Sequence, residues 1–125
     1  MPIDMTLPYD NENVFAKILR GEIPIREVYR DEWALAFHDI TPQAPVHVLV
    51  IPTGRYVSWD DFSVQASDAE ITGFTRAVGK VARDLGLPAT GYRMLANIGR
   101  DGHQEFAHLH VHIFGGKPMG PMLSR

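Results

Sequence analysis

Apolar side chains in this chain follow two spacings, one typical of helices and one typical of strands. The clearest helical stripe lies between residues 67 and 85, where apolar residues recur every three or four positions and so line one face of a helix. Ser67 and Glu70 have the spacing of a capping box at its start, and Gly86 follows its end. A shorter stripe at 14–19, also followed by a glycine, predicts a short N-terminal helix. The stripe of the main helix consists of Ile71, Phe74, Val78, Val81 and Leu85.

The remaining apolar segments are short and predict strands. Residues 46–51 form a continuous run of β-branched residues and leucine, which is typical of a central strand. Residues 27–29 and 34–37 flank a polar turn and predict a hairpin. Two further strands are expected at 92–96 and 108–114. Five strands with a main helix on one face predict an α+β fold in a single domain.

Length and composition exclude several classes of protein. The chain has 125 residues, of which 45% are hydrophobic and 22% charged, as expected for one globular domain. Twelve basic residues against 15 acidic ones give a net charge of −3, which argues against nucleic acid as a partner. There are no cysteines, so disulfides, thiolate metal sites and cysteine nucleophiles are excluded.

The sequence also predicts where the domain begins, where it ends and where it resides. No run approaches the ~18 consecutive apolar residues of a membrane helix, and the N-terminus lacks the basic and then apolar segments of a signal peptide. We therefore predict a cytoplasmic protein with no membrane partner. We expect residues 1–11 to be a flexible N-terminal extension, 12–117 to form the domain, and 118–125 to be a C-terminal tail.

Three of the six histidines occupy alternate positions, at His108, His110 and His112. Because alternate side chains of a strand point to the same face, the three imidazoles should form one row with about 7 Å between neighbours. The intervening apolar residues should face the core beneath the main helix. These are Leu109, Val111 and Ile113.

A row of imidazoles favours one of two kinds of chemistry. Neutral imidazole is a common ligand of zinc and copper, but the outer histidines of a straight strand lie about 13 Å apart. A metal would therefore take two of the three together with His47. Alternatively, one imidazole attacks phosphorus and forms a covalent intermediate, while its neighbours fix its tautomer and protonate the leaving group.

Two residues outside the row could join it. His47 shares one face of the central strand with Leu49 and Ile51. If that strand neighbours the histidine strand, His47 becomes a fourth imidazole. Asp39 ends the second strand, where it is either the cap of the turn that follows or a partner for ribose hydroxyls.

The segment His-Leu-His-Val-His-Ile-Phe at 108–114 resembles the His-φ-His-φ-His-φ-φ motif of the histidine triad (HIT) superfamily. The resemblance covers about residues 13–116 and is greatest to the histidine triad nucleotide-binding branch. It implies a HIT-like fold: a five-stranded, mostly antiparallel sheet with one main helix and a short N-terminal helix. It also implies a homodimer whose two sheets join. The segments that carry it outside the motif are 14–18, 21–24, 36–40, 42–47 and 91–93.

The resemblance further implies a purine nucleoside phosphoramidase. Such enzymes bind purine nucleoside monophosphates and hydrolyse their phosphoramidates and acyl-adenylates, without a metal or other cofactor. The middle histidine, His110, is then the nucleophile and forms a nucleotidyl-histidine intermediate. His112 contacts the phosphate and the leaving group, while His108 and His47 orient the nucleophile.

The same resemblance assigns the substrate-binding residues. Asp39 holds the ribose hydroxyls. Asn97, with the backbone of Gln104 and Glu105, approaches the phosphate. Apolar and aromatic residues, with one histidine, surround the base and the sugar. They are Phe15, Ile18, Ile23, Phe37, His38, Ile40 and Leu49.

The chain departs from the family pattern in three places. Asn13 and Ala16 stand where many bacterial relatives have a Cys-x-x-Cys pair, so no structural zinc is expected. Glu105 stands where many relatives have a serine near the leaving group. The tail from Pro118 lacks the tryptophan that some relatives place over the partner's site. The leaving group therefore does not follow from the resemblance.

Other functions also fit parts of the sequence. A dinucleoside polyphosphate hydrolase belongs to the same superfamily, but the short chain and the Gly115-Gly116 ending of the motif favour the nucleotide-binding branch. A non-catalytic nucleotide sensor would bind AMP without turning over any phosphoramidate. A metalloprotein would contain stoichiometric zinc or copper. The physiological substrate and the choice between adenine and guanine stay open.

Overall fold

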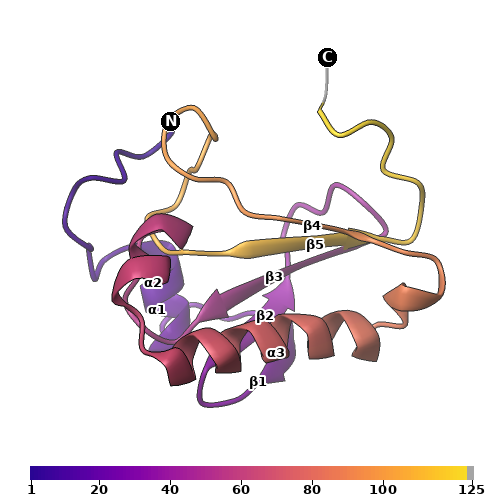
Figure 1. Cartoon of the computed structure of the whole chain (residues 1–125), viewed down its shortest axis with the longest axis horizontal. Helices are drawn as coiled ribbons and strands as arrows, with labels where there is room; N and C mark the ends of the chain where they lie inside the picture. Colours follow the sequence, from indigo (N-terminus) through magenta and orange to yellow (C-terminus); the bar gives the residue numbers. More distant parts are fainter. Residues whose placement is uncertain (124–125) are drawn as a thin grey trace.

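A computed structural model describes residues 1–123 of the chain (Figure 1). Its centre is a five-stranded sheet in the order β1-β2-β3-β5-β4, in which every neighbouring pair is antiparallel. The predicted α+β fold with a mostly antiparallel five-stranded sheet is confirmed. The strands are β1 (Glu27–Arg30), β2 (Ala34–His38), β3 (Val46–Pro52), β4 (Arg93–Leu95) and β5 (Val111–Gly115).

The helices agree with the sequence prediction except for one that it missed. The main helix α3 (Asp68–Asp84) begins with the predicted capping box of Ser67 and Glu70, and the short helix α1 (Val14–Leu19) is also present. The missed helix is α2 (Trp59–Gln65), which starts with a second capping box formed by Ser58 and Asp61. Only Phe62 of α2 is buried, so the helix has no apolar stripe to reveal it. A single 3-10 turn, Leu87–Ala89, follows α3.

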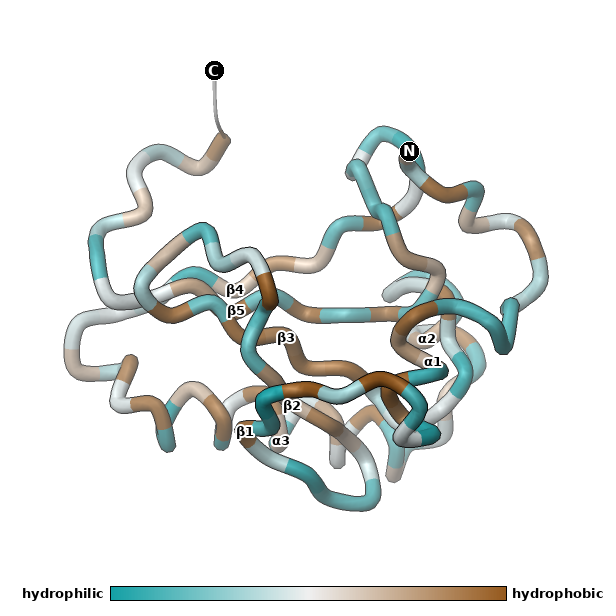
Figure 2. The backbone as a smooth tube through the Cα atoms, turned by 180° about the vertical axis from the view of Figure 1, so that it is seen from behind, coloured by the Kyte–Doolittle hydropathy of each residue, from teal (hydrophilic) through white to brown (hydrophobic). Residues whose placement is uncertain are grey.

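The sheet carries an apolar cluster on each face because alternate residues of its strands point in opposite directions. In Figures 1 and 2, α3 lies along one side of the sheet, while the N- and C-terminal segments run along the other. On the α3 side, Ala36, Val48 and Val50 pack with Phe74 and Val81 of the helix. On the opposite side, α1 contributes to a second cluster, formed by Phe15, Ile18, Leu35, Phe37, Leu49 and Ile51.

Strand β5 begins later than the sequence pattern predicts. The expected strand at 108–114 starts only at Val111, and the ladder with β3 ends where Val50 pairs with Val111. Pro52, near the end of β3, has no N–H to donate to a longer ladder. The N–H of Leu109 instead donates to the carbonyl of Tyr56, at 2.8 Å. His108 and His110 therefore lie ahead of the strand, His108 in a bend and His110 in irregular backbone.

Both terminal segments contact the rest of the chain. The N–H of Ile3 donates to the carbonyl of Gln104 (2.7 Å), a contact that the expectation of a flexible extension does not anticipate. The Arg93 guanidinium donates to the carbonyls of Met119 and Gly120. The last two residues of the predicted tail 118–125 lie outside the described residues. The division at residues 11/12 and 117/118 stays a prediction.

Two features of the fold bear on partners. The sheet ends in two edge strands, β1 and β4, each of which pairs with a neighbour on one side only. The homodimer itself stays a prediction. Within residues 1–123, no helix is long and apolar enough to cross a membrane.

Candidate active site

Strands β3 and β5 bring His47 into contact with the triad. Leu49 pairs with His112 across the ladder, and the Nε2 atom of His47 lies 3.0 Å from the Nδ1 atom of His112. The expected fourth imidazole is therefore present. The backbone N–H of Gln43 donates to Nδ1 of His47 (3.1 Å), so the neutral ring carries its proton on Nε2 and donates it to His112. The remaining nitrogen of His112, Nε2, must then carry an N–H.

His110 carries its proton on the other ring nitrogen from His112. Its Nδ1 lies 2.7 Å from the carbonyl oxygen of His108, and because a carbonyl only accepts, this nitrogen carries the proton. The lone pair of the neutral ring is then on Nε2. The His110 and His112 rings meet edge to face, with centroids 5.1 Å apart. The site thus combines a free imidazole lone pair with a neighbouring imidazole N–H.

His108 differs from the other two triad histidines because both of its ring nitrogens bond to groups of the protein. Its ring is fully buried, with Nε2 at 2.9 Å from the carbonyl of Pro52 and Nδ1 at 2.5 Å from the hydroxyl of Tyr9. Both ring nitrogens are therefore occupied within the protein. The intervening Leu109, Val111 and Ile113 belong to the cluster beneath α3, as predicted.

All four imidazoles have lowered pKa values, which favours their neutral form at pH 7. Burial lowers the pKa of His108 to about 4, and burial together with the neighbouring His110 and His47 lowers the pKa of His112 to about 4. Burial also lowers the pKa of His110 and of His47, against the opposing effect of the Asp39 carboxylate. A neutral imidazole has the lone pair that a nucleophile needs.

The depressed pKa of His108 predicts a loss of stability in mild acid. Unfolded, the ring takes up a proton near its ordinary value of 6.5, whereas the folded ring does so only near 4. Its stabilising contribution is therefore complete above pH 6.5 and is lost as the pH falls toward 4. Between pH 7.5 and pH 5 we expect His108 alone to lower the free energy of unfolding by about 2 kcal/mol, as measured by urea denaturation.

An NMR titration identifies the source of that loss. The His108 ring should stay neutral in the folded protein down to about pH 5. Titration of the folded His108 ring near pH 6.5 would contradict the account.

Asp39 fills one of the two roles that the sequence left open, that of the turn cap, and its role toward ribose hydroxyls stays a prediction. One oxygen, Oδ1, accepts the backbone N–H of Thr41 (2.8 Å) and so caps the turn. The other, Oδ2, lies 3.4 Å from Nε2 of His47. The carboxylate thus closes one end of the histidine cluster, where its charge favours a hydrogen-bond donor such as a hydroxyl.

The residues that could hold a metal differ from those expected. Asp39, His47 and His112 offer ligand atoms within 4.8 Å of one another, and they are the one such group found among residues 1–123. The expected set had two triad histidines with His47, but His110 directs Nδ1 to a carbonyl instead. The facing nitrogens of His47 and His112 already share a proton, which a cation would have to displace. The absence of a metal from the reaction stays a prediction.

An apolar wall borders the imidazoles. The Phe15 ring lies 4.8 Å from the His110 ring, 5.9 Å from the Phe37 ring and 5.3 Å from the Phe106 ring, measured between centroids. The structure gathers most of the apolar residues predicted to surround the base and sugar in this one cluster. They are Phe15, Ile18, Phe37 and Leu49, with Ile23 packed at the margin.

Some predicted substrate-binding residues are placed differently. Ile40 is 95% exposed, because it lies within the turn that Asp39 caps. Gln104 is buried, its N–H donates to the carbonyl of Gly99 and its carbonyl accepts the N–H of Ile3, and its role toward a phosphate stays a prediction. The Glu105 carboxylate pairs with Nε2 of His103 at 2.9 Å.

Two other predicted residues are only partly buried. The N–H of His38 donates to the carbonyl of Arg26, and the His38 side chain is half-buried. Asn97 is half-buried in the loop after β4. Their roles toward a ligand stay predictions.

Sequence reasoning missed three aromatic residues of the site. Phe106 packs on Phe15 and lies 6.4 Å from the His110 ring, and Phe114 packs against His47 with centroids 4.2 Å apart. The pairing of strands could have revealed Phe114, which stands opposite His47 in the ladder. Tyr9 lies 99 residues before His108, in a segment without periodicity, so no sequence signal points to it.

Comparison with known proteins places the chain in a family. The HIT domain profile matches residues 20–119. A HIT-like protein of Azospirillum brasilense is 58% identical over 121 residues, covering 97% of this chain and 99% of the relative. The purine nucleoside phosphoramidase of Escherichia coli K12 is 42% identical over 113 residues, covering 90% and 94% of the two chains.

A solved structure agrees with the sequence comparison. The HIT family hydrolase from Clostridium thermocellum superposes with a TM-score of 0.79 at 36% identity, covering 92% of this chain and 99% of that one. The sequence and the fold thus give the same assignment, and the resemblance inferred from the triad is confirmed. The chain belongs to the HIT domain family.

Proposed function

We propose that the protein is a nucleotidyl hydrolase that cleaves the P–N bond of purine nucleoside phosphoramidates, and the corresponding bond of acyl-adenylates. The observation that carries this proposal is the pairing of tautomers in the site. Nε2 of His110 offers a lone pair, and the ring beside it, His112, offers an N–H. The 42% identity to a purine nucleoside phosphoramidase supports the substrate class.

The first step of the proposed reaction is attack by His110. Its Nε2 lone pair forms a bond to the α-phosphorus while the bond from phosphorus to the leaving nitrogen breaks. The electron pair of that bond goes to the nitrogen, which takes a proton from Nε2 of His112 and departs as an amine. His112 is then one proton short, and the positive charge on the phosphorylated His110 ring offsets this until the second step returns the proton. The His108 carbonyl keeps the Nδ1–H of His110 in place, so the ring presents the correct nitrogen throughout.

The second step is hydrolysis of the nucleotidyl-histidine. Water attacks the phosphorus and returns a proton to His112, and the bond from phosphorus to Nε2 of His110 breaks. The products are a nucleoside monophosphate and the free enzyme. Every proton transfer in this scheme uses imidazole, so no metal or other cofactor is needed.

The proposal is tested by single-turnover hydrolysis of an adenosine phosphoramidate in the presence of excess chelator. We expect full turnover at the rate seen without chelator, because no metal takes part in either step. A rate that falls with chelator and returns with zinc would contradict the metal-free mechanism. Binding of AMP without turnover of any phosphoramidate would instead support a nucleotide sensor.

A further inference from the structure

The hydroxyl of Tyr9 contacts the triad from a segment that the proposed reaction does not use. It lies 2.5 Å from Nδ1 of His108, and the two rings meet edge to face with centroids 5.5 Å apart. Tyr9 is partly buried and precedes α1. It is therefore placed to act on His108 from the side opposite Pro52.

The hydrogen bonds of His108 fix which atom donates in this contact. The carbonyl of Pro52 only accepts, so Nε2 of His108 carries the proton, and Nδ1 accepts from the hydroxyl of Tyr9. The ring is thereby held at both nitrogens. The carbonyl of the same residue accepts the Nδ1–H of His110. His108 thus links Tyr9 to His110, with its ring bonded to the Tyr9 hydroxyl and its backbone carbonyl bonded to the His110 ring.

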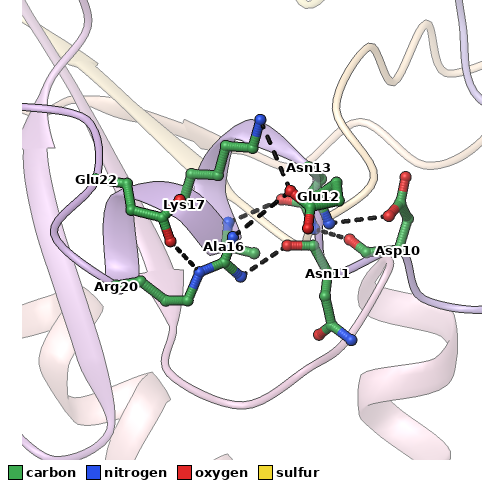
Figure 3. Close-up of polar contacts among 8 residues, drawn as sticks. All are labelled: Asp10, Asn11, Glu12, Asn13, Ala16, Lys17, Arg20 and Glu22. Atoms are coloured by element: carbon green, nitrogen blue, oxygen red, sulfur yellow. Dashed lines mark hydrogen bonds and ion pairs between the residues drawn. The ribbon is translucent and has the colours of Figure 1, made fainter.

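The segment that carries Tyr9 is fastened to α1, as Figure 3 shows for the residues that follow it. Asn13 caps the helix, and its amide donates to the carbonyl of Asp10 at 2.7 Å. Arg20 at the end of α1 donates to the carbonyl of Asn11, also at 2.7 Å. These bonds fix the chain directly after Tyr9, so the position of its hydroxyl is set by the fold.

We propose that Tyr9 is a positioning residue whose hydroxyl holds the His108 ring in its Nε2–H form and thereby keeps the His108 carbonyl on the Nδ1–H of His110. The nucleophilic lone pair then faces the site. This inference rests on the proposed function for its kinetic consequence. Its structural part, the set of tautomers, can be measured without any turnover.

The fully buried ring explains why the hydroxyl matters. Without it, Nδ1 of His108 loses its donor in a place closed to bulk water. The other tautomer, with the proton on Nδ1, would form no more hydrogen bonds, because its Nε2 would turn a lone pair toward the oxygen of the Pro52 carbonyl. The ring must then shift, and the backbone carbonyl that orients His110 shifts with it. Burial also raises the pKa of Tyr9, which keeps the hydroxyl protonated as a donor.

The test uses the full chain with Tyr9→Phe, which keeps the packed ring and removes only the hydroxyl. The matched control is Tyr29→Phe, which removes a partly buried hydroxyl that donates to Asp31. Tyr29 lies on β1, which β2 and β3 separate from β5. The readouts are the nitrogen NMR shifts of the His108 and His110 rings, the single-turnover rate per folded molecule, the affinity for AMP, and the melting temperature.

We expect Tyr9→Phe to move the Nδ1 signal of His108, to reduce the Nδ1–H population of His110, and to slow turnover about tenfold. Affinity for AMP should change less than twofold, and Tyr29→Phe should show none of the ring or rate effects. Unchanged ring signals in Tyr9→Phe, or changed signals with an unchanged rate, would overturn the inference. An equal loss of rate in Tyr29→Phe would also overturn it, since stability alone would then account for the loss.

Failure of the proposed function gives a different result. In that case the wild-type protein itself shows no turnover, while the ring signals still respond to Tyr9→Phe. The kinetic part of the inference then falls with the function, and the tautomer set stands. Ring signals that do not respond remove the inference in every case.

Discussion

Replacing His110 with alanine is expected to abolish hydrolysis of adenosine phosphoramidates. The single-turnover rate should fall at least about 10⁴-fold, because no other ring in the site combines a free lone pair with an orienting partner. His108 has both nitrogens bonded within the protein, and His112 presents an N–H. Neither can take over the attack on phosphorus.

The control for this prediction is His103→Ala. His103 is exposed and its ring pairs with the Glu105 carboxylate, so its loss should change the rate less than twofold. AMP should still bind His110→Ala, because the apolar wall around Phe15 and Phe37 is retained. Residual turnover of His110→Ala within tenfold of the wild type would remove His110 from the role of nucleophile.

Replacing His112 with alanine should slow the reaction in a way that depends on the leaving group. An alkylamine needs the proton that Nε2 of His112 supplies, so its release should slow by about 10²–10³-fold. p-Nitrophenolate leaves from a p-nitrophenyl ester of AMP without taking a proton, so the rate with this ester should fall less than tenfold. The measurement is single-turnover release of both leaving groups from the same preparation.

Equal losses for the two leaving groups would contradict the role of His112 as an acid. His47→Gln tests the role of His112 as an acid through its hydrogen-bond partner, because glutamine keeps a donor near Nδ1 of His112. It should preserve more of the alkylamine rate than His47→Ala. The reverse order would show that His47 does not act through His112.

The sequence predicts the sheet and the main helix well because their apolar patterns are local. The continuous apolar run at 46–51 and the apolar stripe of α3 each lie within one short segment of the chain. Helix α2 was not predicted because it buries a single large side chain, Phe62, and so has no apolar stripe. The start of β5 was misplaced because the limit is imposed by Pro52, a residue of another strand.

The candidate site was predicted as a set of residues but not as a set of hydrogen bonds. The alternation of side chains in the central strand placed His47 beside the triad only if that strand neighbours the histidine strand, and the pairing of β3 with β5 meets this condition. The tautomers depend on groups remote in the sequence, such as the Gln43 N–H and the Pro52 carbonyl, and no local pattern reports them. Tyr9 was missed for the same reason.

The central claim is that a nucleotide becomes covalently attached to His110, and the most direct test is to trap it. Wild-type protein is mixed with labelled adenosine phosphoramidate, quenched in alkali to protect the phosphorus–imidazole bond, digested and mapped by mass spectrometry. We predict one AMP group on His110 and none in His110→Ala. Label on another residue, or turnover in which a time course of quenched samples contains no nucleotidyl-enzyme, would contradict the account.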